Sequence, residues 1–296
     1  MSKKYLAGLD DGHGINTAGK RTVALKEDIM FNGKVRKKGT VIHENEFNEV
    51  IMKKIEPHLK RCGISYMETA PTDDDTSLAT RANRANSAGC DILVSIHANA
   101  LAGTKWQNKA YGLVVIKTKG CQSKTDKLAK IMYDHLKEVD FPSNGETKYG
   151  VRVDTEISGF TLAILRQTKM PAVLVELGFM DNWRDVKVMC TEKFQDECAE
   201  GIAKAICEYF GVAYKKESTL NTTSKKKMIK NIYGKEINIR SSADWDGKVV
   251  GKLKAGDSLT LKEGPLTAKN GRTKMYKTVS GTYVTASSKY VKIIEI

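Results

Sequence analysis

Three hydrophobic runs in the sequence each lead to a residue that can bind a metal ion or transfer a proton. These residues are His13, His97 and Glu176. Residues at the carboxyl ends of neighbouring parallel strands meet in the crevice above an open α/β sheet, even when they are distant in sequence. Two imidazoles and a carboxylate supply three protein ligands for a catalytic zinc ion and leave a fourth position open to water. The three positions therefore predict one metal-hydrolase site.

Each of these residues also has a structural explanation. His13 lies in a glycine-rich turn, where a lone histidine more often faces solvent. His97 interrupts an apolar strand, which is harder to explain without a function. A carboxylate inside an apolar run is costly to bury, so Glu176 must lie at a strand end, be paired, or stand beside a metal. Structural ion pairs account for single cases of this kind, but the joint occurrence favours a site.

The elements that would position these residues alternate between strand and helix. Apolar runs predict strands at residues 5–9, 92–96, 111–117 and 172–177. Helical spacing of apolar residues predicts helices at residues 44–59, 81–88, 125–139 and 192–210. This alternation predicts an α/β fold with a mostly parallel, twisted sheet flanked by helices on both faces.

Composition places the 296-residue chain among soluble globular proteins, with 41% hydrophobic and 28% charged residues. No run approaches the roughly 20 apolar residues that cross a bilayer, so we expect no stable membrane insertion. The first apolar run is interrupted at Asp10, too early for a secretory signal, so we expect no export signal. The six cysteines include no Cys-x-x-Cys pair, and we expect them to be reduced and none to bind the metal.

Positive charge is concentrated near the carboxyl end of the chain. Residues 215–296 contain 18 Lys/Arg and 7 Asp/Glu, which is a net +11 of the total +14. A polar stretch at residues 215–225 is typical of a flexible linker. We therefore expect a catalytic domain at residues 1–214, a linker at 215–225 and a second domain at 226–296.

Four segments carry a family resemblance. They are Asp11-Gly12-His13-Gly14, Glu44-Asn45-Glu46-Phe47-Asn48, Ser95-Ile96-His97-Ala98-Asn99-Ala100 and Pro171-Ala172-Val173-Leu174-Val175-Glu176-Leu177-Gly178-Phe179. From about Tyr5 to Phe210 the sequence resembles the zinc-dependent N-acetylmuramoyl-L-alanine amidases of bacterial autolysins and phage endolysins, the amidase-3 family. It departs from the family pattern at Asp11, where a proline commonly precedes the glycine.

The resemblance implies a division of roles among four residues. His13, Glu44 and His97 would bind one Zn²⁺ ion, and Glu176 would be the catalytic acid/base. Asn48 sets the register that selects Glu44 over the neighbouring glutamates, although a glutamate at a helix start is ordinarily explained by the helix dipole. The bond implied joins N-acetylmuramic acid to the L-alanine of the peptidoglycan stem peptide.

Other polar residues of this region receive structural interpretations. Arg81 is interpreted as a member of an ion pair, and Asn99 is as consistent with a turn as with a ligand contact. The remaining histidines are interpreted as surface residues on or beside helices, namely His43, His58 and His135. A basic insertion at residues 20–41 is centred on a predicted hairpin turn at Asn32-Gly33. A solvated loop is favoured there over a contact with substrate.

The C-terminal segment shows short β-prone stretches separated by glycine turns, which is typical of a small all-β barrel. Residues 226–296 resemble bacterial SH3-like cell-wall-binding domains. Its charge would favour anionic wall polymers such as teichoic acids, and nothing in it indicates nucleic-acid binding. Its aromatic residues are as consistent with a ligand surface as with packing, namely Trp245, Tyr276, Tyr283 and Tyr290.

Together these features predict a peptidoglycan hydrolase of the phage or prophage endolysin type. We expect synthesis in the host cytoplasm and action at the cell wall after holin-type permeabilisation of the membrane. A bacterial autolysin without a signal peptide is the alternative origin. A zinc carboxypeptidase acting on wall peptides and a non-catalytic wall-binding protein are the alternative functions.

Overall fold

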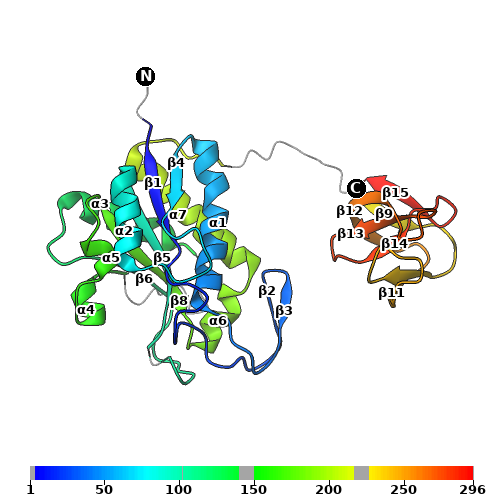
Figure 1. The fold of residues 1–296 in the computed structure, drawn as a ribbon, viewed down its shortest axis with the longest axis horizontal. Helices are drawn as coiled ribbons and strands as arrows, with labels where there is room; N and C mark the ends of the chain where they lie inside the picture. Colours follow the sequence, from blue (N-terminus) through cyan, green and yellow to red (C-terminus); the bar gives the residue numbers. More distant parts are fainter. Residues whose placement is uncertain (1–3, 102, 140–149, 217–226, 296) are drawn as a thin grey trace. The chain divides into compact units, whose positions relative to one another are not determined.

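The computed structural model describes residues 4–101, 103–139, 150–216 and 227–295. The chain divides into two compact units, Met1–Glu217 and Ser218–Ile296, which are considered separately below (Figure 1). The expected linker at residues 215–225 falls largely outside the described residues. Within the described ranges, none of the helices combines the length and hydrophobicity that crossing a membrane requires.

The first unit is built on a six-stranded sheet. Its strand order is β4 (Ser65–Glu68), β1 (Leu6–Asp10), β5 (Ile92–Asn99), β8 (Ala172–Phe179), β6 (Leu113–Lys117) and β7 (Gly150–Val153). Every neighbouring pair is parallel except β6 and β8, which are antiparallel. The predicted mostly parallel sheet is confirmed.

Helices cover both faces of this sheet (Figure 1). One face carries α1 (Glu44–Cys62), α3 (Ser123–Leu136) and α7 (Glu192–Phe210), and the other carries α2 (Leu78–Ala88) and α5 (Ala163–Arg166). Two further short helices are α4 (Asp154–Ser158) and α6 (Trp183–Met189). Strand β5 shows the physical basis, because Ile92, Val94 and Ile96 pack in one apolar cluster and Leu93 packs in the other. Such two-sided burial explains the continuous apolar runs of the sequence.

Two strands extend further than their apolar runs indicate. Strand β5 continues to Asn99 and β8 to Phe179, so His97 and Glu176 lie inside strands rather than at their ends. The expectation that they end their strands is therefore corrected. His97 and Glu176 are direct partners in the β5–β8 register, and a register shift follows between His97 and Asn99. Backbone pairing continues past the point where the apolar pattern stops.

The basic insertion contains the expected hairpin, formed by β2 (Ile29–Phe31) and β3 (Lys34–Arg36). Asn32 and Gly33 both have positive φ angles, 49° and 70°, as a tight hairpin turn requires. Phe31 is 1% exposed and packs on Phe47 of α1, with 4.9 Å between ring centroids. The insertion is therefore anchored to the start of α1 rather than solvated throughout.

The second unit is a seven-stranded antiparallel sheet in the order β11, β10, β14, β13, β12, β9, β15. The strands are β9 (Lys227–Asn231), β10 (Ile237–Arg240), β11 (Val249–Leu253), β12 (Ser258–Thr267), β13 (Lys274–Thr278), β14 (Tyr283–Thr285) and β15 (Val291–Glu295). They enclose a small apolar cluster that includes Ile229, Leu253 and Val284. This all-β arrangement is compatible with the predicted SH3-like domain.

Candidate active site

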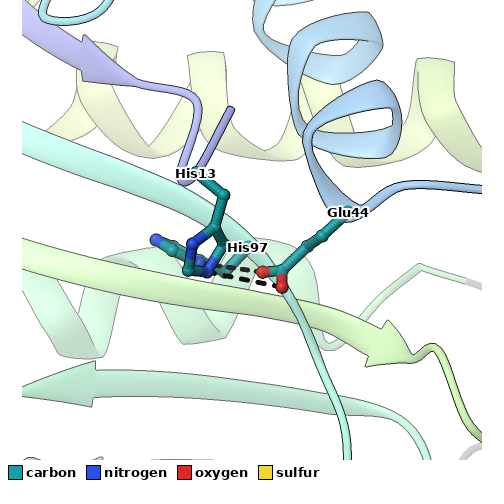
Figure 2. Close-up of side chains that lie close together, drawn as sticks. All are labelled: His13, Glu44 and His97. Carbon is teal, nitrogen blue, oxygen red and sulfur yellow. Dashed lines mark hydrogen bonds and ion pairs between the residues drawn. The ribbon is translucent and has the colours of Figure 1, made fainter. Parts of the chain in front are cut away.

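Three of the four predicted site residues converge at one point of the first unit (Figure 2). His13 follows β1, Glu44 begins α1, and His97 lies on β5. The Nδ1 atom of His97 lies 2.9 Å from Oε1 of Glu44, and Nε2 of His13 lies 3.4 Å from Oε2 of Glu44. One ligand-capable atom from each residue lies within 4.8 Å of the other two. The three side chains are therefore close enough together to bind one metal ion.

The turn that carries His13 is held by its backbone. His13 has φ of 68°, a left-handed conformation that is uncommon for a residue other than glycine. Arg81 Nη2 donates a 2.7 Å hydrogen bond to the carbonyl of His13, and Asn48 Nδ2 donates one of 2.9 Å to the carbonyl of Gly12. A Cβ atom at Gly12 would lie 2.1 Å from the ring of His97, so this position requires glycine. These contacts hold the backbone of the turn from which the side chain of His13 reaches the cluster.

Glu44 is positioned by the insertion that precedes it. Its backbone N–H donates to the carbonyl of Lys20 at 2.9 Å, which ties the start of α1 to the start of the insertion. The other glutamates of the segment have different partners: Glu46 accepts hydrogen bonds from Arg36 and from the backbone of His43, and Glu49 contacts Lys53. Only Glu44 of these three faces the two histidines.

Two carboxyl groups of the site have opposite pKa shifts. Burial raises the pKa of Glu44, but the hydrogen bond and charge of His97 outweigh it, and the resulting pKa lies below the ordinary value. Glu176 accepts no such hydrogen bond from the residues that the structure describes. Burial, reinforced by the negative charge of Glu44, raises the pKa of Glu176 to about 7. Paired groups whose environments separate their pKa values are typical of acid/base sites.

His97 also contacts a buried polar network on the side away from Glu44. Its Nε2 atom lies 3.1 Å from Oγ of Ser95, which donates a 2.5 Å hydrogen bond to Asp10. Arg81 Nη1 forms an ion pair with Asp10 at 2.9 Å, as the structural interpretation of Arg81 expects. Burial raises the pKa of Asp10, but Arg81 and the other hydrogen-bonding groups outweigh it and bring the pKa below its ordinary value.

The remaining polar residues of the sequence hypothesis lie elsewhere. Asn99 Oδ1 accepts a hydrogen bond from the backbone of Ala100, which is a turn contact. His58 and His135 lie on α1 and α3 and are partly exposed, as the surface interpretation expects; His58 also contacts Tyr214, and His135 contacts Glu208. Their helices α1 and α3 pack near α7, which supplies neighbours that a single amphipathic helix does not reveal.

Sequence reasoning missed a cation at the site. Lys20 Nζ lies 3.7 Å from Oε2 of Glu44, although nothing in the local sequence distinguishes it from the other basic residues of the insertion. A cavity of about 410 Å³ opens beside the histidines and is lined by residues that include His13, His97, Ser77 and Arg81. The two histidines therefore border this cavity, whose lining includes neither Glu44 nor Glu176.

The architecture is that of an α/β enzyme with a polar site on the sheet. Residues 8–208 match the amidase-3 family model, which is described as N-acetylmuramoyl-L-alanine amidase. The chain belongs to the N-acetylmuramoyl-L-alanine amidase family. This membership confirms the predicted amidase activity.

Individual relatives agree with this assignment. The chain is 31% identical over 307 residues to the endolysin of Bacillus phage SPP1, with 100% of both chains covered. It is 32% identical over 151 residues to the N-acetylmuramoyl-L-alanine amidase CwlM of Bacillus licheniformis, covering 51% of this chain and 53% of the relative. The chain thus matches about half the length of that second relative.

Solved structures support the predicted fold class. The N-acetylmuramoyl-L-alanine amidase of Clostridium difficile 630 has a TM-score of 0.55 and 25% identity, covering 71% of this chain and 98% of that one. The catalytic domain of CwlV from Bacillus (Paenibacillus) polymyxa has a TM-score of 0.55 and 27% identity, covering 71% and 99%. The α/β fold of the first unit is therefore shared with known amidases.

Proposed function

We propose that this amidase cleaves the bond between N-acetylmuramic acid and L-alanine with one zinc ion held by His13, Glu44 and His97. Glu176 is the proton carrier in this proposal. The observation that carries it is the convergence of the two imidazoles on Glu44, beside a second carboxyl group whose pKa is raised to about 7. Family membership supplies the reaction class.

The residues present fit a zinc ion. Glu44 is 1% exposed, and its Oε2 atom accepts no hydrogen bond from the described residues. A buried carboxylate oxygen without a donor is costly, and a cation between the carboxylate and the two imidazoles would remove that cost. Two nitrogen donors and one oxygen donor are also the set expected of a catalytic zinc site with an open position.

Bound zinc would lower the pKa of a coordinated water and polarise the scissile carbonyl. Glu176 accepts the proton of the attacking water and delivers it to the nitrogen of the departing alanine. Its raised pKa suits both steps, because a group that titrates near neutral pH exists in both forms. His13, Glu44 and His97 would hold the ion, and no serine or cysteine nucleophile is needed.

We further propose that residues 226–296 form a domain that attaches the enzyme to the cell wall through anionic polymers. A cavity of about 350 Å³ in the second unit supports this assignment. Its lining includes three aromatic residues, Tyr233, Trp245 and Tyr290, and two cations, Arg240 and Lys252. The net charge of +11 in residues 215–296 favours an anionic partner.

The biological setting that we propose is lysis of a bacterial host by a phage or prophage enzyme. The full-length alignment with a phage endolysin supports this setting. The enzyme would be synthesised in the host cytoplasm and reach peptidoglycan after holin-type permeabilisation.

Mass spectrometry of purified peptidoglycan after digestion tests the proposed bond specificity. We expect glycan-free stem peptides with a new L-alanine amino terminus. Release of single C-terminal amino acids would instead indicate a zinc carboxypeptidase. An undigested wall with bound protein would indicate a wall-binding protein without activity and would contradict the proposal.

A further inference from the structure

The polar network behind His97 connects the candidate metal site to the core. Oγ of Ser95 lies between Nε2 of His97, at 3.1 Å, and Oδ2 of Asp10, at 2.5 Å. The other oxygen of Asp10 accepts hydrogen bonds from Arg81 at 2.9 Å and from Thr69 at 2.5 Å. Ser95 and Thr69 are 0% exposed, and Asp10 and Arg81 are 1% exposed. Solvent therefore does not compete for these bonds.

The donors and acceptors in this network have a fixed direction. An ionised carboxylate can only accept hydrogen bonds, so the single hydroxyl hydrogen of Ser95 is donated to Asp10. Oγ of Ser95 can then only accept from His97, which requires a hydrogen on Nε2. The opposite nitrogen, Nδ1, is the one that faces Glu44.

The direction of these hydrogen bonds determines which nitrogen of His97 can bind a metal ion. An imidazole binds a metal through an unprotonated nitrogen and keeps its hydrogen on the other one. A network that holds hydrogen on Nε2 leaves the lone pair of Nδ1 for the ion. The ring of His97 also lies close against Gly12, since a Cβ atom there would be 2.3 Å from Nε2 and 2.6 Å from Nδ1. The packing against Gly12 thus limits the orientation of the His97 ring, and the hydrogen-bond network independently determines which of its nitrogens is free to bind the ion.

We propose that Ser95 and Asp10 are positioning residues that present Nδ1 of His97 to the metal. Arg81 and Thr69 bind the other oxygen of Asp10, which does not face Ser95. The inference rests on the proposed zinc site and adds to it the residues that act through a ligand. Hydrogen-bond partners of metal-bound histidines typically contribute 10–100-fold to metal affinity.

A matched pair of variants separates positioning from burial. Ser95→Ala removes the hydroxyl between His97 and Asp10. Thr69→Val removes a hydroxyl that bonds Asp10 on its other oxygen, away from the one that Ser95 binds. Each variant deletes one buried hydrogen bond to the same carboxylate. We expect Ser95→Ala to weaken zinc binding by about 10–100-fold in a competition titration of the full chain. Thr69→Val should change it by less than about threefold, because it leaves the Ser95–His97 contact in place.

An equal effect in both variants, or no effect of Ser95→Ala, would overturn the inference while leaving the zinc site intact. Failure of the unmodified protein to bind zinc would overturn the proposed function itself. A second readout needs no variant: nitrogen NMR of the zinc-loaded protein labelled in its five histidines. We expect a protonated Nε2 and a metal-bound Nδ1 for His97, and the reverse assignment would contradict the inference.

Discussion

The candidate active site and the cavity of the second unit differ in how far their polar and aromatic side chains are exposed to solvent. At the active site Glu44 is 1% exposed and Asp10 is 1% exposed, and most polar atoms have protein partners. In the second unit Trp245 and Tyr233 are each 40% exposed on the rim of an open cavity. Desolvated groups with shifted pKa values suit bond cleavage, whereas exposed rings and cations suit the capture of a polymer.

The charged side chains of the two regions also differ in their exposure to solvent. In the first unit, buried charges face one another at fixed distances, as Arg81 and Asp10 do. In the second unit, cations such as Lys252 are exposed, and salt screens exposed charges far more than buried ones. Changes at the first region should therefore alter chemistry or metal binding, and changes at the second should alter attachment alone.

The largest expected effect is on turnover at the active site. Glu176→Gln keeps the size of the side chain but removes the proton carrier, so kcat should fall by about 10²–10⁴-fold. Release of stem peptides from purified peptidoglycan measures this loss. Glu68→Gln, on the edge strand β4, is the matched control and should retain activity. A Glu176→Gln protein that digests wall at the original rate would remove Glu176 from the mechanism.

The second-largest expected effect is on the free energy of unfolding of the metal-free protein. The pKa of Glu176 in the folded state is raised from 4.5 to about 7, so the folded protein binds a proton at Glu176 more tightly than the unfolded chain does. Stability from this group is fully present below pH 4.5 and is lost as pH rises through 7. Across this window, unfolding in a chelator should show the unmodified protein losing up to about 3 kcal/mol relative to Glu176→Gln. Parallel pH profiles of the two proteins would contradict the buried, raised-pKa description of Glu176.

At the second region the expected effect is smaller and confined to attachment. Trp245→Ala removes an aromatic ring from the cavity and should weaken sedimentation with purified walls by about tenfold, since an interface anchor contributes more than about 1 kcal/mol. Turnover of soluble wall fragments should stay unchanged. Val279→Ala, at a residue that is 61% exposed and outside the cavity lining, is the control. Loss of turnover on soluble fragments would mean that the two regions are not separable as proposed.

The smallest expected effect is that of salt. Raising the salt from about 0.1 M to 1 M shortens the screening length from about 10 Å to 3 Å. Wall binding should weaken several-fold, while zinc affinity, which depends on buried groups, should change less. Binding to walls that does not respond to salt would argue against an anionic polymer as the partner.

The sequence predicted the central strands because their runs are buried on both faces, as in β5 and β8. It missed β4, whose residues are only partly buried and show no clear pattern. It likewise missed β7, a four-residue strand of half-exposed residues. Short edge strands owe their conformation to pairing with a neighbour, which local composition does not record.

The prediction of site residues from the sequence is limited in the same way. His13 and His97 follow from the hydrophobic runs, but Glu44 required the family resemblance because it begins a helix instead of following a strand. Ser95 and Asp10 are ordinary residues in the sequence, and their roles emerge only when β1 and β5 lie side by side. Their register places Asp10 opposite Ser95 directly, a contact between residues 85 positions apart.

The central claim is that Glu44 holds the metal and Glu176 carries the proton. Zinc content of the full chain, measured by mass spectrometry after dialysis for Glu44→Gln and Glu176→Gln, tests it most directly. We predict that the unmodified protein and Glu176→Gln each retain about one zinc ion per chain, as a site with three protein ligands requires, and that Glu44→Gln loses it. Retention of zinc by Glu44→Gln, or its loss from Glu176→Gln, would contradict this division of roles.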